Sequence, residues 1–210
     1  MITIIDVDIG NLRSVANAFR RVGAEVGIAT SVAEADGARV LVLPGVGAFA
    51  PAMRNLCSLG FDRLIADRVA SGQTPLIGIC LGMQMLAERS HEHGATAGLG
   101  LIPGEVVRLQ AAAPGERVPN IGWLPVRAEK PSAMFPPGTD TQTFYHVHSF
   151  HMACSNPVDV AATFEFGGRR IVTAVERGNV FGVQFHPEKS QDAGLNLLSS
   201  LLGHVQQLGH

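Results

Sequence analysis

One stretch of ten residues decides the fold of this chain: Pro75-Leu76-Ile77-Gly78-Ile79-Cys80-Leu81-Gly82-Met83-Gln84. Its first half is short and apolar, which predicts a buried strand over Pro75–Ile79. A helix is expected to follow over Met83–Arg89. Gly78 and Gly82 flank Cys80 at positions −2 and +2, the spacing of a nucleophile elbow, which is a sharp turn between a strand and a helix. Glycine suits such a turn because it has no Cβ.

This elbow would expose the Cys80 side chain above the carboxyl ends of the strands, where ligands bind in open α/β sheets. At the N-terminus of a helix, the positive end of the dipole favours the thiolate. The backbone N–H of Leu81 would be free to point at an oxyanion. A buried structural cysteine between two packing glycines is the alternative. Cys57 and Cys154 lack this setting and are expected to be inert.

Strand and helix patterns alternate along the first half of the chain. Short apolar runs predict strands over Ile2–Asp8, Glu25–Thr30 and Arg39–Leu43, the last ended by Pro44-Gly45. Amphipathic runs predict helices over Asn11–Val22 and, with a break near Leu59-Gly60, over Pro51–Ser71. This alternation predicts an α/β fold, with a central, mostly parallel sheet covered by helices on both faces.

The second half changes character, because its predicted strands are separated by short turns. They cover Ile102–Leu109, Thr143–Met152, Val158–Glu165, Ile171–Glu176 and Val180–Gln184. Gly167-Gly168 has the composition of a hairpin turn, so part of this half is expected to pair antiparallel. A helix over Ala193–Gln206 closes the chain. Two Pro- and Gly-rich segments, Ala111–Arg117 and Pro131–Thr141, are assigned as loops.

Composition and charge exclude several classes of protein. A length of 210 residues with 46% hydrophobic residues suits one domain, 1–210, with a sizeable core. The net charge of −2, with acids and bases interspersed, gives little support for a nucleic-acid groove. The chain starts without a signal-peptide pattern, and no apolar run approaches the roughly 20 residues that span a bilayer. We therefore expect a soluble cytoplasmic protein that binds neither nucleic acid nor membrane.

A second stretch with chemical potential is Gln184-Phe185-His186-Pro187-Glu188-Lys189-Ser190. His186 and Glu188 are two residues apart, so an extended chain through Pro187 would bring both side chains to the same side. Glu188 could then accept from one ring nitrogen while the other faces the thiol, which is the logic of a Cys-His-Glu triad. An H-x-E pattern alone is common. Together with the predicted elbow at Cys80, this H-x-E pattern indicates a catalytic base and its orienting carboxylate.

A third stretch is Val42-Leu43-Pro44-Gly45-Val46-Gly47-Ala48-Phe49, which also follows a predicted strand. Its two closely spaced glycines allow backbone N–H groups to line up toward an anion. Val46-Gly47 could therefore supply the second donor of an oxyanion hole. A simple turn from strand to helix is the alternative.

Several other side chains have two interpretations each. His146, His148 and His151 lie on one predicted strand, and the first two would share a face and could begin a metal site. No cysteine or carboxylate pattern completes the ligand set, so we predict no metal and assign them to the lining of a polar pocket. Trp123 suits the core or a surface anchor about equally. Asp8 is predicted to cap the first helix.

With these residues the sequence resembles the class I, or triad-type, glutamine amidotransferases, which share a G-x-C-x-G-x-Q elbow and a late H-P-E. Within that class it is similar to the glutaminase subunits of imidazole glycerol phosphate synthase, in histidine biosynthesis. The stretches behind this closer similarity run from one end of the chain to the other: Gly10–Val15, Leu43–Phe49, Gly78–Gln84, Gly98–Gly104, Gly122-Trp123, Val147–Ser149 and Gln184–Ser190.

The resemblance implies a flavodoxin-like amidotransferase domain, and no cofactor is expected. It implies hydrolysis of L-glutamine to glutamate and ammonia through a thioester on Cys80, with His186 as base and then acid and Glu188 as its orienting partner. The oxyanion hole would use the backbone of Leu81, Val46 and Gly47. The residues implied to hold glutamine are Gly47, Gln84, His148, Ser149 and Phe150.

The resemblance also implies a partner protein. Ammonia would pass to a (β/α)8 cyclase subunit, bound at the active-site face to form a heterodimer. Asn11, Trp123 and Lys189 would lie at or near that interface. An isolated glutaminase would waste glutamine, so the free chain is expected to be poorly active.

Some positions depart from the family pattern, and they motivate competing hypotheses. Asp8 stands where glycine is usual, Asn120 and Leu124 replace a usual His and Asn, and His146 and Phe150 replace a usual Phe and Tyr. The changes at Asn120 and Leu124 leave open a glutaminase that serves another acceptor, for example in sugar modification. A binding subunit without catalysis is a third hypothesis. A peptidase or chaperone is a fourth, and the context of Gln84 disfavours it.

Overall fold

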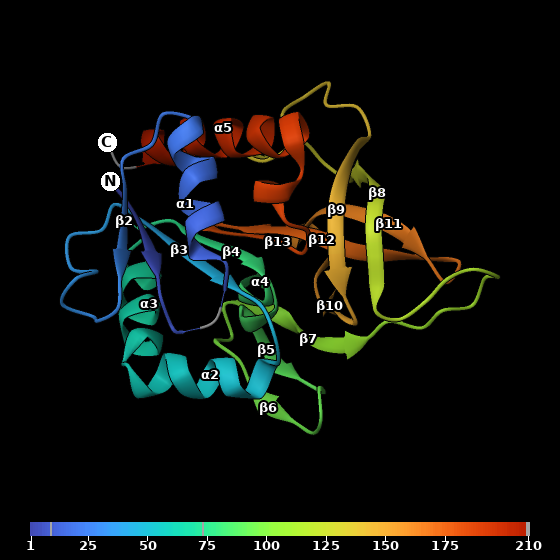
Figure 1. Ribbon diagram of the computed structural model, residues 1–210, viewed down its shortest axis with the longest axis horizontal. Coiled ribbons are helices and arrows are strands. Elements are labelled where there is room, and N and C mark those ends of the chain that lie inside the picture. Colours follow the sequence, from blue (N-terminus) through green and yellow to red (C-terminus); the bar gives the residue numbers. More distant parts are fainter. Residues whose placement is uncertain (9, 73, 209–210) are drawn as a thin grey trace.

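The computed structural model describes residues 1–8, 10–72 and 74–208, and Figure 1 shows helices above and below a central sheet. Five strands of this sheet run parallel. In spatial order they are β2 (Val26–Ala29), β1 (Ile2–Ile5), β3 (Val40–Gly45), β4 (Leu76–Cys80) and β13 (Val180–Val183). Every residue of β1, β3, β4 and β13 is buried, as expected for parallel strands covered on both faces. The predicted parallel α/β core is confirmed.

Helices cover both faces of these parallel strands. The pair on one face is α1 (Leu12–Arg21) and α5 (Gln191–Leu208), and the pair on the other is α2 (Phe49–Ser58) and α3 (Phe61–Ala70). One apolar cluster lies under the first pair and includes Phe19 and Leu198. A second cluster lies under the other pair and includes Leu56 and Ile65. Burial of these two clusters is the main force that holds the layers together.

Beyond β13 the sheet continues with antiparallel strands, as predicted for the second half. They are β12 (Arg169–Arg177), β11 (Val160–Phe166), β8 (Asn120–Ala128) and β9 (Gln142–His148), and a short 3-10 turn, η1 (Pro157–Asp159), precedes β11. Gly167 and Gly168 join β11 to β12 with φ angles of 62° and 67°. Two positive φ angles in a two-residue connection form a hairpin turn that glycine favours, so the prediction of a turn here is confirmed.

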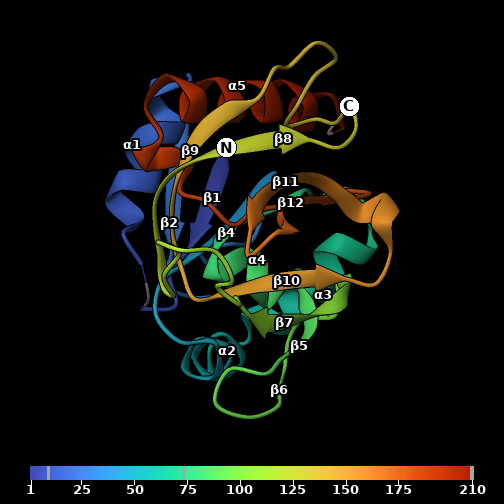
Figure 2. The same ribbon diagram turned by 90° about the vertical axis from the view of Figure 1, so that its right-hand side faces the viewer.

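A second, smaller sheet lies beside the antiparallel half. Its strands are β10 (Phe150–Cys154), β7 (Ile102–Arg108), β5 (Ala87–Ser90) and β6 (Thr96–Ala97). Figure 2 shows β10 and β7 below β11 and β12. Met152 of β10 and Val175 of β12 are buried in the same apolar cluster, so the two sheets share a core.

The prediction of one strand over Thr143–Met152 was wrong. β9 ends at His148 and β10 begins at Phe150, in the other sheet. Between them the Ser149 carbonyl accepts from the Leu109 backbone N–H at 2.9 Å. The residues on both sides of Ser149 suit a strand equally well, so only the tertiary pairing reveals where the chain changes sheet.

The prediction of a helix over Met83–Arg89 was also wrong. α4 spans only Leu81–Met85, and β5 follows at once. The returning chain donates to the carbonyl groups that a longer helix would have used: Leu99 N–H to Met85 O at 2.8 Å and Gly100 N–H to Ala87 O at 3.0 Å. A Cβ on Gly98 would lie 2.2 Å from the Ala87 oxygen, so this close return requires glycine.

Two strands that contain a proline differ from the prediction. The third strand was predicted to stop before Pro44-Gly45, but β3 continues through both residues, paired to Ile79 and Cys80. No strand was predicted over Asn120–Ala128, which forms β8 and contains Pro125. β11 pairs with β8 only at Arg127 and Ala128, so Pro125 has a ladder on one side of the strand only.

Asp8 does not cap the first helix, contrary to the prediction. The N-cap of α1 is Asn11, whose side-chain oxygen accepts from the Ser14 backbone N–H at 3.3 Å. Asp8 instead has a φ of 61°, and its backbone N–H donates to the Asp6 carboxylate at 2.8 Å. The short Asp6–Asp8 turn therefore keeps Asp8 outside the helix.

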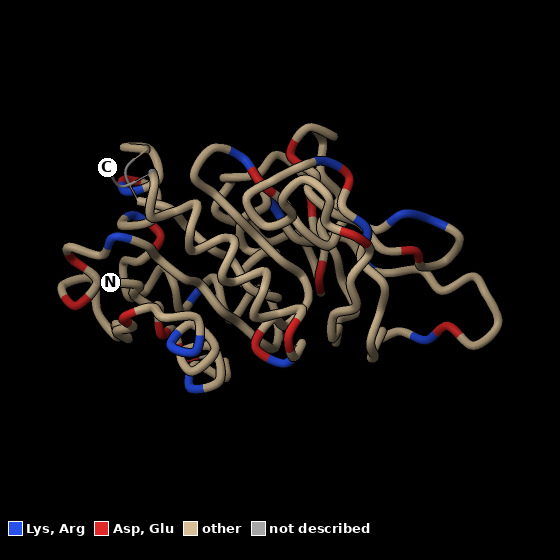
Figure 3. The backbone as a smooth tube through the Cα atoms, turned by 90° about the horizontal axis from the view of Figure 1, so that it is seen from above, with Lys and Arg blue, Asp and Glu red and all other residues tan. Residues whose placement is uncertain are grey.

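Acidic and basic residues are interspersed along the backbone, as Figure 3 shows. Within residues 1–8, 10–72 and 74–208, no helix is long and apolar enough to cross a membrane.

Candidate active site

Cys80 occupies the sharp turn that the sequence predicts. It is the last residue of β4 and the N-cap of α4, and its backbone has φ 55° and ψ −110°. A positive φ is uncommon for a side chain with a Cβ and costs on the order of 1–3 kcal/mol. This strained conformation is what lifts the thiol out of the strand at the carboxyl edge of the sheet.

The two glycines beside Cys80 are required by close backbone contacts. A Cβ on Gly78 would lie 2.8 Å from the Gly82 carbonyl and the Met83 nitrogen, and a Cβ on Gly82 would lie 1.7 Å from the Leu43 oxygen. α4 therefore packs directly on β4 and β3 without side chains between them. The predicted elbow is present in the structure.

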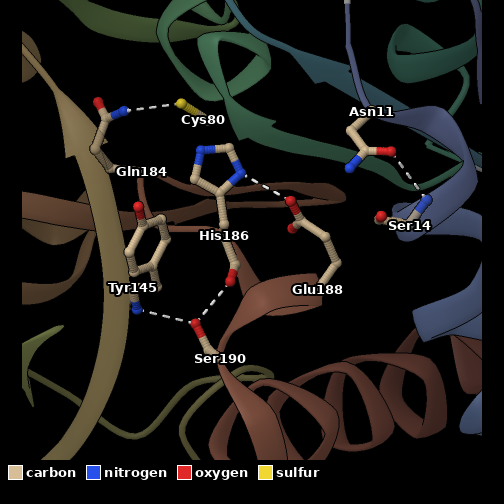
Figure 4. A network of polar contacts seen from close by, with 8 residues as sticks. All are labelled: Asn11, Ser14, Cys80, Tyr145, Gln184, His186, Glu188 and Ser190. Carbon is tan, nitrogen blue, oxygen red and sulfur yellow. Dashed lines mark hydrogen bonds and ion pairs between the residues drawn. The ribbon is translucent and has the colours of Figure 1, made fainter. Parts of the chain in front are cut away.

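His186 and Glu188 lie beside Cys80 in the arrangement expected of a triad (Figure 4). His186 Nδ1 is 2.8 Å from Glu188 Oε1, and the two side chains are only 3% and 2% exposed. Glu188 belongs to a short 3-10 turn, η2 (Pro187–Lys189). The Ser190 hydroxyl donates to the His186 carbonyl at 2.6 Å and accepts from the Tyr145 N–H at 3.0 Å. These contacts fix the backbone that carries the histidine.

The protonation of His186 follows from its surroundings. Burial alone would lower its pKa, but the Cys80 thiol and the Glu188 carboxylate outweigh burial and raise the pKa to about 9. His186 Nε2, the ring nitrogen that does not contact Glu188, is buried and has no hydrogen-bond partner among the described residues. At neutral pH the imidazole is therefore protonated beside the sulfur.

A cavity of about 270 Å³ opens over Cys80. Its lining is Val46, Gly47, Cys80, Leu81, Gln84, Glu92, Pro119, Val147, His148, Ser149, Phe150 and His186. Every residue that the sequence assigns to glutamine or to the oxyanion hole is in this set. Glu188 is outside it, because it lies behind His186.

The predicted oxyanion loop packs against the elbow. β3 ends at Gly45, where a Cβ would come within 3.0 Å of the Leu81 Cβ, so the loop and α4 touch. Gly47 has a φ of 94°, a conformation that favours glycine. The structure thus brings Val46, Gly47 and Leu81 to the same cavity as the Cys80 thiol.

His146 and His148 form a fixed neutral pair rather than a charged one. His148 Nδ1 is 2.9 Å from the Phe150 carbonyl, which can only accept, so this nitrogen carries the proton. His148 Nε2 then accepts from His146 Nδ1 at 3.2 Å. Burial lowers the pKa of His146 to about 2 and that of His148 to about 4. His148 lines the cavity, whereas His151 bonds to the Met152 carbonyl outside it.

The family profile for class I glutamine amidotransferases matches residues 3–200 of this chain. The chain belongs to this family. The imidazole glycerol phosphate synthase subunit HisH of Moorella thermoacetica is 45% identical over 215 residues, which cover 100% of this chain and 99% of that protein. The HisH subunit of Chlorobaculum tepidum is 42% identical over 200 residues, which cover 95% and 98%. At this identity and coverage, the amidotransferase belongs with the HisH subunits.

The fold comparison agrees. The crystal structure of a glutamine amidotransferase superposes on this chain with a TM-score of 0.75 at 20% identity, covering 100% of this chain and 99% of the other. At such low identity the similarity concerns the fold alone. The flavodoxin-like class I fold expected from the sequence is confirmed.

The residues predicted at a partner interface gather on one face of the amidotransferase. Trp123 is 46% exposed, and its ring lies 5.9 Å from that of Tyr145 in an edge-on contact. Lys189 Nζ lies 5.8 Å from the centre of the same Tyr145 ring. Asn11 and Lys189 both line a small hollow that His186 and Glu188 also line. This face is therefore next to the triad.

Two polar residues of the site had no role in the sequence analysis. Glu92 lines the cavity, and its Oε2 accepts from the Phe49 N–H at 2.7 Å, where α2 has no side-chain cap of its own. Nothing marks Glu92 in the sequence, since it lies in a loop-like run. Gln184 donates to Cys80 Sγ at 3.7 Å. Its two-residue spacing from His186 is a signal that could have found it, because alternate residues of an extended chain share a side.

Proposed function

We propose that this chain, residues 1–210 acting as a single amidotransferase domain, hydrolyses L-glutamine to glutamate and ammonia. The observation that carries the proposal is the Cys80 thiol on a strained elbow, facing the buried His186–Glu188 pair at the floor of a cavity. Membership of the class I glutamine amidotransferases supports the same chemistry.

The reaction begins with attack of the Cys80 thiolate on the carboxamide carbon of glutamine, forming a C–S bond. The carbonyl electrons move to oxygen, where the N–H groups of Leu81 and the Val46-Gly47 loop stabilise the negative charge. Protonated His186 gives its proton to the leaving nitrogen, the C–N bond breaks, and ammonia departs. His186 then takes a proton from water, which attacks the thioester. The C–S bond then breaks, which restores the thiolate and releases glutamate, and the proton of the new carboxyl group passes to ammonia or solvent.

The polar lining of the cavity fits the other end of glutamine. Gln84 Nε2 donates to both the Phe150 carbonyl and the Gln184 side chain at 3.0 Å, so its two N–H groups are used within the protein. Gln84 can offer only its carbonyl oxygen to a ligand. Glu92 adds a carboxylate to the same cavity. We propose that these two acceptors hold the α-ammonium group, with His148, Ser149 and Phe150 enclosing the rest of the substrate.

Replacing Glu92 with glutamine is expected to raise the KM for glutamine about tenfold while changing kcat less than about twofold, because one charge-assisted contact to the substrate is lost. A glutamine oxygen can still accept from Phe49, so the start of α2 is kept. Steady-state kinetics of glutamate release give both constants. Glu105→Gln, at an exposed carboxylate outside the cavity, is the matched control and should leave KM unchanged. An unchanged KM in Glu92→Gln would show that Glu92 does not hold the substrate.

We further propose that ammonia passes to a (β/α)8 cyclase subunit that makes imidazole glycerol phosphate. The relatives are named as subunits of that synthase. The exposed Trp123 and the side chains of Asn11 and Lys189 beside the triad support docking at this face. A partner bound there would receive ammonia close to where it forms.

The test is glutamate release by the purified chain, alone and with the cyclase subunit loaded with its nucleotide ligand. We expect little activity from the chain alone and stimulation of at least about a hundredfold with the loaded partner, equivalent to roughly 3 kcal/mol of coupling. Glutaminase activity that the cyclase subunit does not stimulate would support the glutaminase chemistry but would point to another ammonia acceptor. Absence of activity in both conditions would favour a binding subunit without catalysis.

A further inference from the structure

Gln184 is a fully buried polar side chain at the heart of the site, with 0% exposure. It follows β13, and its backbone N–H donates to the Thr173 carbonyl at 2.8 Å. An amide costs free energy to bury unless its polar atoms find partners. The hydrogen-bond partners of the Gln184 side chain therefore indicate its role.

The orientation of the Gln184 amide is set by a chain of hydrogen bonds. The Phe150 carbonyl is an acceptor only, so the group of Gln84 that lies 3.0 Å from it must be the NH2. The same NH2 lies 3.0 Å from the side-chain amide of Gln184. Gln184 must therefore present its oxygen to this NH2. The NH2 of Gln184 is left to face Cys80 Sγ at 3.7 Å. The reverse orientation would set two donors against each other.

The Phe150 carbonyl, where this series of hydrogen bonds begins, takes part in a second hydrogen bond. It also accepts from His148 Nδ1 at 2.9 Å, and His148 is held in turn by His146. The acceptor that orients Gln84 is thus fixed by β9 and β10 together. Figure 4 shows Gln184 and His186 reaching Cys80 from different directions.

We propose that Gln184 is a positioning residue for the nucleophile, which holds the Cys80 thiolate by donating a side-chain N–H to the sulfur. The inference rests on the proposed glutaminase chemistry and adds a residue to it. His186 and Gln184 then have separate tasks, because His186 carries the proton and Gln184 remains neutral at every pH at which the protein is folded. An N–H donor favours a thiolate over a thiol, since the charged sulfur is the stronger acceptor.

The test is the rate at which a small neutral alkylating agent, iodoacetamide, modifies Cys80 as a function of pH, resolved from Cys57 and Cys154 by mass spectrometry of the Cys80 peptide. The full-length chain is compared with Gln184→Met, which keeps the length of the side chain and loses the donor. We expect the midpoint of the alkylation profile to move up by about one pH unit, which is roughly a tenfold loss of rate below the midpoint. In complex with the cyclase subunit, kcat is expected to fall and KM to change little.

Two further variants make the result decisive. Thr173→Val is the matched control, because it replaces another buried polar side chain next to Gln184, one whose hydroxyl has no partner among the described residues, and should not move the profile. Gln84→Met frees the Gln184 amide to turn its oxygen toward sulfur, and should move the midpoint in the same direction as Gln184→Met. If Gln184→Met fails to fold, the alkylation midpoint of Gln84→Met tests the proposal in its place.

Folded variants whose midpoints match that of the wild type would overturn the role of Gln184. This outcome differs from failure of the proposed function itself. If the proposed function itself failed, the wild-type chain would release no glutamate even with the loaded cyclase subunit.

Discussion

Cys80→Ala is expected to lower kcat for glutamine hydrolysis by on the order of 10⁵-fold, the largest effect of any single substitution in this chain. Without the sulfur no thioester can form, and His186 has no nucleophile to assist. Alanine has a Cβ like cysteine, so the strained backbone at φ 55° and the glycine contacts around it are unchanged. The measurement is glutamate release at saturating glutamine with the cyclase subunit present.

Cys154→Ala is the matched control for that experiment. Burial, with a smaller effect from Asp159, raises the pKa of the Cys154 thiol to about 12, so this sulfur stays protonated and unreactive at neutral pH. We expect Cys154→Ala to keep kcat within about twofold of the wild type. If instead Cys80→Ala retained more than about a hundredth of the activity, the thioester route would have to be abandoned.

The parts of the fold and site that sequence predicts well are those coded by neighbouring residues. The elbow depends on glycines two residues from Cys80, and the histidine–carboxylate pair depends on the extended backbone around Pro187. Both patterns involve only neighbouring residues, and both predicted features are present in the structure. The parallel core is similarly local, because each of its strands is a short apolar run between helices.

The elements that sequence analysis missed depend on contacts between distant residues. β8 contains Pro125, and it is a strand because β9 pairs with it from Asn120 to Val126 and β11 pairs with it at Arg127 and Ala128. The end of α4 is set by the return of the chain at Gly98–Leu101, which no local pattern announces. Glu92 was missed for the same reason, since its partner Phe49 lies 43 residues away in the sequence. The partner of Gln184, Cys80, lies 104 residues away, and only the spacing of Gln184 from His186 is a local signal.

Glu188→Gln is expected to lower kcat by about 10³-fold while leaving KM nearly unchanged. Glutamine matches the shape of glutamate, so the packing around η2 is kept. What is lost is the negative charge that stabilises the imidazolium and fixes Nδ1 as the donor. A neutral amide can also turn its NH2 toward Nδ1, which would select the wrong tautomer. Glutamate release in the presence of the cyclase subunit measures this effect, and Glu105→Gln again serves as the control.

The same variant tests the electrostatics of the site through stability. The folded state raises the pKa of His186 from 6.5 to about 9, so protonated His186 stabilises the fold fully below about pH 6.5, and this contribution is lost as pH rises through about 9. Glu188→Gln removes one of the causes of the raised pKa. The free energy of unfolding, from urea titrations across this pH range, should therefore fall less steeply with rising pH in the variant than in the wild type. An identical slope in both proteins would mean that Glu188 does not set the charge of His186, and the loss of kcat would then have to come from the orientation of the ring alone.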